Sequence, residues 1–294
     1  MRTHYSPLRY PGGKSSLIKY LSDVVSLNCP IETYIEPYAG GAGAALGLLF
    51  TNRVKKMVLN EYDDGLYKFW QVVLNNTEDL IKKISNVQIS VQEWKKQKKI
   101  LNNHKKGQKR SDLDIGFSTF FLNRCNRSGI LMAGPIGGKE QLGKWKIDAR
   151  FNKEDLIKRI VRIAEYKNRI RLFNLDAIVF LKNQLPKLNS DLDKTLVYLD
   201  PPYYEKGSTL YRHSYDNDNH IELQKFLKNQ PKIKWILSYD DVPFIHDLYK
   251  DTNKNKISMN HFAYKAKVGK ELIIASDNCN LPEKQLILFR QREP

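Results

Sequence analysis

The sequence predicts an α/β fold in which a Rossmann-like, mostly parallel sheet carries an inserted, mainly helical segment. Near the N-terminus a strand, a glycine-rich loop and a helix follow one another, as they do at the opening of a nucleotide-binding α/β unit. A second strand–helix step comes next, and the same alternation returns in the second half of the chain. Between the halves lies a lysine-rich stretch without this alternation, which predicts an insert.

The first half supplies two strand–helix steps. Apolar residues recur at helical spacing after Lys14 until Pro30 ends the run, which predicts an amphipathic helix. The elements expected next are a strand at 33–35, a glycine loop at 36–43, a helix at 44–50, a strand at 57–59 and a helix at 66–73.

The alternation stops from about 76 to 151, where we expect a lysine-rich helix, an apolar run at 117–122 and a Gly/Pro loop at 134–138. It resumes with a helix at 156–164 and strands at 170–173, 195–199, 235–238 and 271–275, with an antiparallel strand near the C-terminus. The segment 247–260 reads as merely polar. We therefore divide the chain into a sheet domain (1–80 and 153–294) and an insert (81–152).

Charge indicates a polyanionic partner. The 294 residues carry a formal net charge of +17, and ten basic residues but only one acid, Glu93, lie between Lys82 and Arg110. A solvated lysine-rich surface is the alternative interpretation of such a run.

Cysteine usage indicates neither a disulfide framework nor a zinc site. Cys29, Cys125 and Cys279 form no CxxC pair and match no histidine spacing, and no metal site is expected. The N-terminal residues lack an apolar signal core, and no stretch reaches the roughly 18 apolar residues of a membrane span. We expect a cytoplasmic protein without a membrane partner.

The strongest chemical motif is Asp200-Pro201-Pro202-Tyr203, which directly follows the buried strand at 195–199. Ligands of open α/β sheets bind at the carboxyl ends of strands, so the motif is directed at a binding site. The side chain of Asp200 and the carbonyl of Pro201 can each accept one N–H bond of an adenine amine, whose lone pair is then freed for attack. Pro201 and Pro202 fix the backbone, and the ring of Tyr203 can stack on a flipped base. A strand ended by a Pro-Pro pair and an Asp cap is the structural alternative.

Two further features favour a nucleoside ligand. The glycines of the 36–43 loop allow backbone N–H groups to approach a ligand closely. Glu61 follows the second strand, where nucleoside-binding α/β proteins place an acid on the ribose hydroxyls. By contrast, the segment ending in Lys14 and Ser15 has Leu8 where a phosphate-binding loop requires glycine, which argues against an NTPase.

Taken together, four segments resemble the Dam-like, α-group DNA adenine-N6 methyltransferases over nearly the whole chain. These segments are Arg9-Tyr10-Pro11-Gly12-Gly13-Lys14, Ile35-Glu36-Pro37-Tyr38-Ala39-Gly40-Gly41-Ala42-Gly43, Asn60-Glu61 and Asp200-Pro201-Pro202-Tyr203. The resemblance implies an S-adenosylmethionine-dependent methyltransferase sheet in which the insert is the target-recognition domain. The order of the motifs, with the cofactor loop first and the catalytic tetrapeptide last, agrees with it.

The resemblance also implies the site residues. The cofactor S-adenosylmethionine would contact Tyr10, Lys14, Tyr38, Gly40, Gly41, Gly43, Glu61, Asp176 and Asp200. Glu61 would bind the ribose hydroxyls, although many relatives have Asp there. Asp176 would help to hold the adenine of the cofactor, and capping of the following helix is its alternative role.

Within the insert, residues 122–129 resemble the recognition segment of the family. Arg and Asn side chains can make bidentate contacts to guanine and adenine edges, so Arg124, Asn126 and Arg127 are expected to read bases and Arg9 to contact DNA. Contact with phosphates alone is the alternative for each of them. The residue pattern differs from that of GATC-reading members, which leaves the recognised sequence open.

The expected function is site-specific methylation of adenine N6 in double-stranded DNA, by base flipping and in-line displacement. The partner is DNA, a restriction endonuclease is a partner in function rather than in a physical complex, and the protein is expected to be a monomer. An RNA adenine or cytosine amine methyltransferase is the rival enzyme, and a DNA-binding regulator with an inactive methyltransferase fold is the rival outside enzymes.

Overall fold

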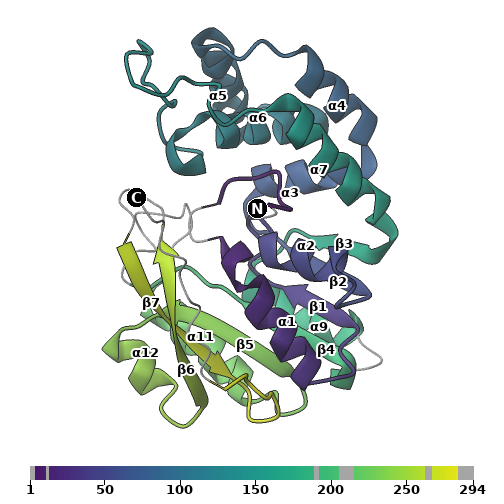
Figure 1. The fold of residues 1–294 in the computed structure, drawn as a ribbon, viewed down its shortest axis with the longest axis vertical. Coiled ribbons are helices and arrows are strands. Elements are labelled where there is room, and N and C mark those ends of the chain that lie inside the picture. The colour runs from purple at the N-terminus through teal and green to yellow at the C-terminus, as the bar shows by residue number, and fades with distance from the viewer. Residues whose placement is uncertain (1–3, 11–12, 189–191, 205–214, 262–266, 284–294) are drawn as a thin grey trace, which may run out of the picture.

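Seven strands form one sheet in the computed structural model, which describes residues 4–10, 13–188, 192–204, 215–261 and 267–283. Their order across the sheet is β3-β2-β1-β4-β5-β7-β6 (Figure 1). The strands are β1 (Thr33–Glu36), β2 (Lys56–Asn60), β3 (Ile170–Phe173), β4 (Thr195–Leu199), β5 (Lys234–Asp240), β6 (Asn253–His261) and β7 (Lys267–Ala275). The first five are mutually parallel and β7 is antiparallel to both of its neighbours, which confirms the predicted fold class.

The helices match the predicted alternation where it was strong. A 3₁₀ turn (Lys14–Leu17) leads into α1, and α2 and α3 follow the first two strands. The α-helices are α1 (Ile18–Leu27), α2 (Gly43–Phe50), α3 (Asp64–Asn75), α4 (Thr77–Asn86), α5 (Val91–Lys105), α6 (Asp112–Cys125), α7 (Lys153–Glu165), α8 (Ala177–Asn183), α9 (Leu185–Leu188), α11 (Asn217–Lys228) and α12 (Pro243–Leu248).

Helix starts are determined locally by side chains that accept bonds from free backbone N–H groups. Asp63, Ser90, Ser111 and Asn152 each accept such a bond at the N-terminus of α3, α5, α6 and α7. All four helices lie between β2 and β3 in the chain. Short polar residues in the sequence therefore determine where these helices begin.

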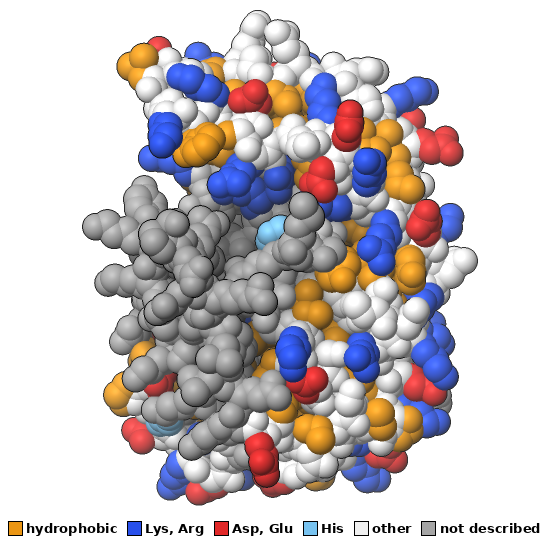
Figure 2. All heavy atoms as spheres, viewed as in Figure 1, with side chains coloured by type: hydrophobic (Ala, Val, Ile, Leu, Met, Phe, Trp, Pro, Cys, Tyr) orange, Lys and Arg blue, Asp and Glu red, His pale blue; other side chains and the backbone are white. Residues whose placement is uncertain are grey.

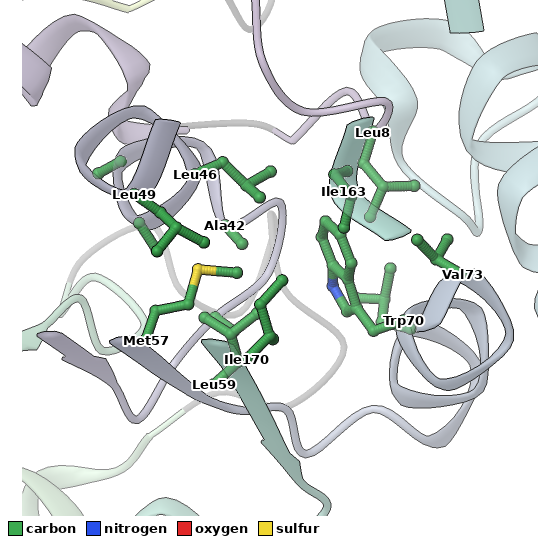
Figure 3. Close-up of a cluster of buried hydrophobic side chains, with 14 of the residues drawn as sticks. Leu8, Ala42, Leu46, Leu49, Met57, Leu59, Trp70, Val73, Ile163 and Ile170 are labelled. Atoms are coloured by element: carbon green, nitrogen blue, oxygen red, sulfur yellow. The ribbon is translucent and has the colours of Figure 1, made fainter. Parts of the chain in front are cut away.

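Alternating strand residues divide the core between the two faces of the sheet. On one face Met57 and Leu59 pack with α2, α3 and α7, and Figure 3 shows them with Leu46, Trp70 and Ile163. On the other face the intervening residues of the same strands pack against α8, α11 and α12. Burial on both faces explains why the central strands read as continuous apolar runs.

The insert lies between β2 and β3 and forms the upper helical part of the view in Figure 1. Its buried side chains, including Trp94 and Phe120, belong to the same apolar cluster as the first face of the sheet. The predicted boundary at residue 81 falls inside α4, whereas the boundary at 152 coincides with the cap of α7. The two parts are therefore continuous in packing although they differ in architecture.

One element contradicts the sequence interpretation. The segment read as merely polar contains β6, which pairs with β7 from Asn253 to His261. It is the outer strand of the sheet, so polar residues and lysines are compatible with it and apolar alternation is not required. No helix in the described part of the chain is long and apolar enough to cross a membrane.

Candidate functional site

Asp200 stands at the end of β4, at the carboxyl edge of the sheet, and is held by two donors. The Nζ of Lys14 lies 2.8 Å from its Oδ1, and the hydroxyl of Ser238 on β5 donates to the same oxygen over 3.0 Å. Both contacts use Oδ1, which leaves Oδ2 available to another donor. The Asp200 side chain is 19% exposed, so this carboxylate is not closed off from solvent.

A second acid completes the cluster. Glu271 on β7 accepts a hydrogen bond of 2.5 Å from the hydroxyl of Tyr203, and its Oε1 lies 3.4 Å from Nζ of Lys14. Lys14 also donates to the Tyr203 hydroxyl over 3.1 Å. The predicted tetrapeptide is thus joined to Lys14, which sequence analysis placed with the cofactor, and to Glu271, which it did not single out. The only available signal for Glu271 was an acid at the start of an apolar strand.

Burial and neighbouring charges act in opposite directions in this cluster. Burial alone would lower the pKa of Lys14, but the carboxylates of Asp200 and Glu271 raise it well above its usual value. Burial raises the pKa of Asp200, and Lys14 partly offsets this effect. The buried ammonium of Lys14 therefore opposes the effect of burial on Asp200, and the two carboxylates in turn favour the charged form of Lys14.

Tyr203 is less open than the stacking role requires. Its side chain is 5% exposed, and the ammonium of Lys14 lies 5.1 Å from the centre of its ring. Pro201 is buried and Pro202 half-buried. A base can reach the ring only after groups around it have moved.

Glu61, after β2, is a buried carboxylate that connects two loops. Its Oε2 accepts from the backbone N–H of Gly40 over 2.7 Å, and Oε1 accepts from that of Asp63 over 2.9 Å. Burial, followed by the charge of Asp63, raises the pKa of Glu61 to about 7. The predicted ribose-binding acid therefore lies directly beside the glycine loop.

The glycines of that loop are explained first by packing within the chain. Gly40 has a φ of +47°, and a Cβ there would lie 2.8 Å from the ring of Tyr10. A Cβ at Gly43 would lie within clash distance of the Ser15 hydroxyl. Tyr10 and Ser15 of the N-terminal segment thus pack so closely against the loop that only glycine fits at these positions. Pro11 and Gly12 of the same segment lie outside the described residues.

The other two predicted cofactor residues have partners of their own. The hydroxyl of Tyr38 lies 2.8 Å from that of Tyr215. Asp176 caps α8, where its Oδ1 accepts from Ile178 and Val179. The capping alternative for Asp176 is therefore realised, with Oδ2 left over from these two bonds.

The structure corrects the expectation for Asn126, whose amide is fully buried. Its Oδ1 accepts from the indole N–H of Trp94 over 2.6 Å, and its Nδ2 donates to the carbonyls of Ile130 and Leu131. An amide whose bonds are all satisfied inside the protein cannot read a base edge in this conformation, because reading would leave buried groups unpaired.

The two predicted base-reading arginines differ from each other. The guanidinium of Arg124 donates to the carbonyl of Arg150, and burial lowers its pKa to about 9. Arg127 is exposed. Of the three side chains chosen from the 122–129 segment, Arg127 is thus exposed, Arg124 is half-buried and Asn126 is buried.

Asn123, which sequence analysis passed over, joins this segment to the N-terminus. Its Oδ1 accepts from the N–H of Arg9 over 2.8 Å, and its Nδ2 donates to the carbonyls of Arg9 (2.7 Å) and Gly129 (2.9 Å). The half-buried Arg9 in turn donates to the carbonyl of Asn126. A side-chain amide that mimics a strand partner leaves no pattern in the sequence.

The lysines of α5 form an exposed basic surface. Figure 2 shows Lys and Arg side chains on the helical part at the top of this face, among acidic and apolar ones. Lys95, Lys96, Lys99, Lys105 and Lys106 are exposed, whereas Lys98 lies over the ring of Trp94. This surface can bind a polyanion through electrostatic attraction alone.

Comparison with known proteins gives consistent results. The family model for D12 class N6 adenine-specific DNA methyltransferases matches residues 10–262. The chain is 24% identical to the type II methyltransferase M.MjaIII of Methanocaldococcus jannaschii, over 85% of this chain and 89% of the relative. It is also 24% identical to the type II methyltransferase M.CviBI of Paramecium bursaria Chlorella virus NC1A, over 82% and 85%.

Among solved structures, the chain resembles the SAM-dependent methyltransferase from Agrobacterium tumefaciens with a TM-score of 0.41 and 8% identity. That likeness covers 90% of this chain and only 62% of the other protein.

Proposed function

The chain belongs to the D12 class of N6 adenine-specific DNA methyltransferases, and from this premise we propose which of its residues carry out the reaction. The protein is a site-specific DNA methyltransferase that acts on the exocyclic amine of adenine. S-adenosylmethionine, when bound, supplies the methyl group from its sulfonium centre. What remains to be assigned is how the chain holds the two reactants.

Asp200 and the carbonyl of Pro201 accept the two N–H groups of the target amine. The observation that carries this assignment is that Lys14 and Ser238 both bind Oδ1 of Asp200, which leaves Oδ2 for the amine at the edge of the sheet. Acceptors placed in this way favour a pyramidal nitrogen with a free lone pair, and they need no reorganisation during in-line displacement. Pro202 keeps the backbone rigid.

The residues around the glycine loop fit a nucleoside cofactor. Glu61 provides a buried carboxylate whose oxygens have lone pairs left for the ribose hydroxyls, beside the backbone of Gly40 and Gly41. Tyr10 covers this loop. We assign Tyr38, Gly43 and the Oδ2 of Asp176 to the rim of the same site, and Lys14 to the support of Asp200.

Double-stranded DNA binds to the insert, 81–152, and its target adenine is flipped toward Asp200. The lysines of α5 contact phosphates, Arg127 contacts bases, and Arg9 and Arg124 support the recognition segment. Flipping brings the adenine against Tyr203, which becomes accessible when DNA binds. The protein acts as a monomer. The type II names of its relatives support a role as the modification partner of a restriction endonuclease.

Removal of the Asp200 carboxylate tests the assignment. Asp200→Ala is expected to lower kcat by about 1,000-fold or more, since the amine loses a directed acceptor. Asp200→Asn keeps the shape and should lose nearly as much. The control is Asp193→Asn, which changes an exposed acid just before β4 and should leave kcat unchanged. Turnover by Asp200→Ala close to wild type would rule out the catalytic role.

The products distinguish the enzymatic rivals. Nucleoside analysis of methylated DNA should yield N6-methyladenine, and no methyl group should enter RNA or cytosine. Mapping of methyladenine across the genome of a methylation-free host that expresses the protein would give the recognised sequence.

A further inference from the structure

Glu271 is a fully buried acid at the point where the last sheet strands reach the active site. It pairs in register with Asp240, the final residue of β5, and begins the buried part of β7. Side chains of a strand alternate between faces, so Glu271 shares its face with Ile273 and Ala275, which are both apolar. A carboxylate in such surroundings is costly to desolvate, and a structural role alone does not require one.

Its contacts are with the catalytic motif. Oε1 lies 2.5 Å from the Tyr203 hydroxyl and 3.4 Å from Nζ of Lys14. Lys14 is itself 2.8 Å from Asp200. Two carboxylates therefore share one buried ammonium, and the phenol of Tyr203 is held between the ammonium and Glu271.

We propose that Glu271 is a positioning residue for methyl transfer: it fixes Lys14 and Tyr203 so that Oδ2 of Asp200 and the ring of Tyr203 face the target adenine in one arrangement. This inference rests on the proposed role of Asp200. Without Glu271, Lys14 would be drawn fully to Asp200 and the Tyr203 hydroxyl would lose its strongest acceptor, so both groups would sample other positions.

The first variant is Glu271→Gln, which keeps the shape and removes the charge. It is expected to lower kcat by about tenfold or more, because a charge-assisted bond is lost both on Lys14, which supports Asp200, and on Tyr203, which faces the adenine. The KM values for DNA and S-adenosylmethionine should change less than about threefold, since Glu271 touches neither ligand. Ser276→Ala is the control: it removes a buried hydroxyl just after the C-terminal end of β7, which bonds to Trp235 and not to the site, and should leave kcat unchanged.

A double-mutant cycle with Tyr203→Phe separates positioning from general loss of structure. If Glu271 acts partly through the Tyr203 hydroxyl, Glu271→Gln should cost less in the Tyr203→Phe background than in wild type. If Glu271→Gln does not fold, Glu271→Asp replaces it; the shorter acid withdraws from both partners and should also lower kcat at unchanged KM.

Three results would overturn the inference. These are a kcat of the Glu271 variant within about twofold of wild type, a loss confined to KM, or losses in the cycle that simply multiply. Asp200→Ala is measured in parallel. If that variant is inactive and Glu271→Gln is fully active, only the role of Glu271 fails, whereas an active Asp200→Ala removes the premise itself.

Discussion

At the scale of single residues, burial raises the pKa of two acids of the site, Asp200 and Glu61. Glu61 is surrounded by backbone amides and by Asp63, and its pKa is raised to about 7. A carboxylate with this pKa is half protonated at neutral pH and loses its charge as the pH falls. The protonated form offers the ribose hydroxyls fewer acceptor sites.

Affinity for S-adenosylmethionine should therefore depend on pH through Glu61. We expect Kd to rise by roughly tenfold between a pH one unit above and a pH one unit below the Glu61 pKa, because the acceptor form is lost over this window. Glu61→Gln should bind weakly and without that dependence. Calorimetric titration at several pH values measures both proteins; the same slope in both would remove Glu61 from the cofactor site.

Neighbouring residues of the recognition segment should differ in what their loss affects. Asn126→Ala should lower the free energy of unfolding by about 1–3 kcal/mol, because Trp94 and two carbonyls lose their partner inside the protein. Arg127→Ala should leave stability unchanged and cost about 1–3 kcal/mol of binding to the correct site, with relaxed discrimination at one position.

Thermal unfolding and methylation of a randomised DNA library test this pair. A stable Asn126→Ala protein with altered sequence preference would restore the base-reading role that its burial argues against.

At the scale of elements, we expect the exposed lysines of α5 to hold DNA by charge and the 122–129 segment to recognise its sequence. Its exposed lysines project from a helix that is anchored by the buried Trp94 and Leu101, so we expect them to contact phosphates while Trp94 holds the recognition segment through Asn126. Phosphate contacts release counterions and carry no sequence information.

Lys99→Ala should accordingly reduce the salt slope of DNA binding by about 0.9 and leave the preferred site unchanged. The matched control is Lys228→Ala, an exposed lysine at the end of α11 on the opposite face of the sheet, which should leave the slope as in wild type. Binding measured at several salt concentrations gives the result. An altered site preference in Lys99→Ala would show that α5 does more than hold phosphates.

At the scale of the whole molecule, residues 4–10 join the insert to the sheet. Asn123 binds the backbone of Arg9, and Arg159 donates to the carbonyl of Ser6. One residue beyond Arg9, Tyr10 lies against Gly40 of the glycine loop. A change in the insert therefore has a short physical path to the glycine loop, where we propose that the cofactor binds.

Asn123→Ala should weaken binding of S-adenosylmethionine by about fivefold or more, although Asn123 lies in the insert and not in the glycine loop, because the segment under Tyr10 loses its anchor. Asn102→Ala, an exposed amide on α5, is the control. Titration of each variant with S-adenosylmethionine measures the change in affinity. Unchanged affinity in Asn123→Ala would mean that the two parts act independently.

The sequence alone determined the features that depend on local patterns. The strands at 170–173 and 195–199 matched the structure to the residue, because each is a short, apolar-rich run whose length is typical of a strand and too short for a helix. Asp200 at the end of β4 and Glu61 at the end of β2 followed from the same logic, since parallel strands place their carboxyl ends at one edge.

Tertiary structure decided everything that depends on partners distant in the chain. The strand β6 was missed because an edge strand needs no apolar face, and its pairing with β7 is what defines it. Lys14 and Glu271 are 257 positions apart in the numbering. They come into contact beside Asp200 only because the folded sheet places β7 and the N-terminal segment next to the end of β4. Asn126 and Arg127 are adjacent in sequence, yet one is buried and the other exposed. Composition cannot separate two such neighbours, because burial is set by the packing of Trp94 against the segment and not by residue type.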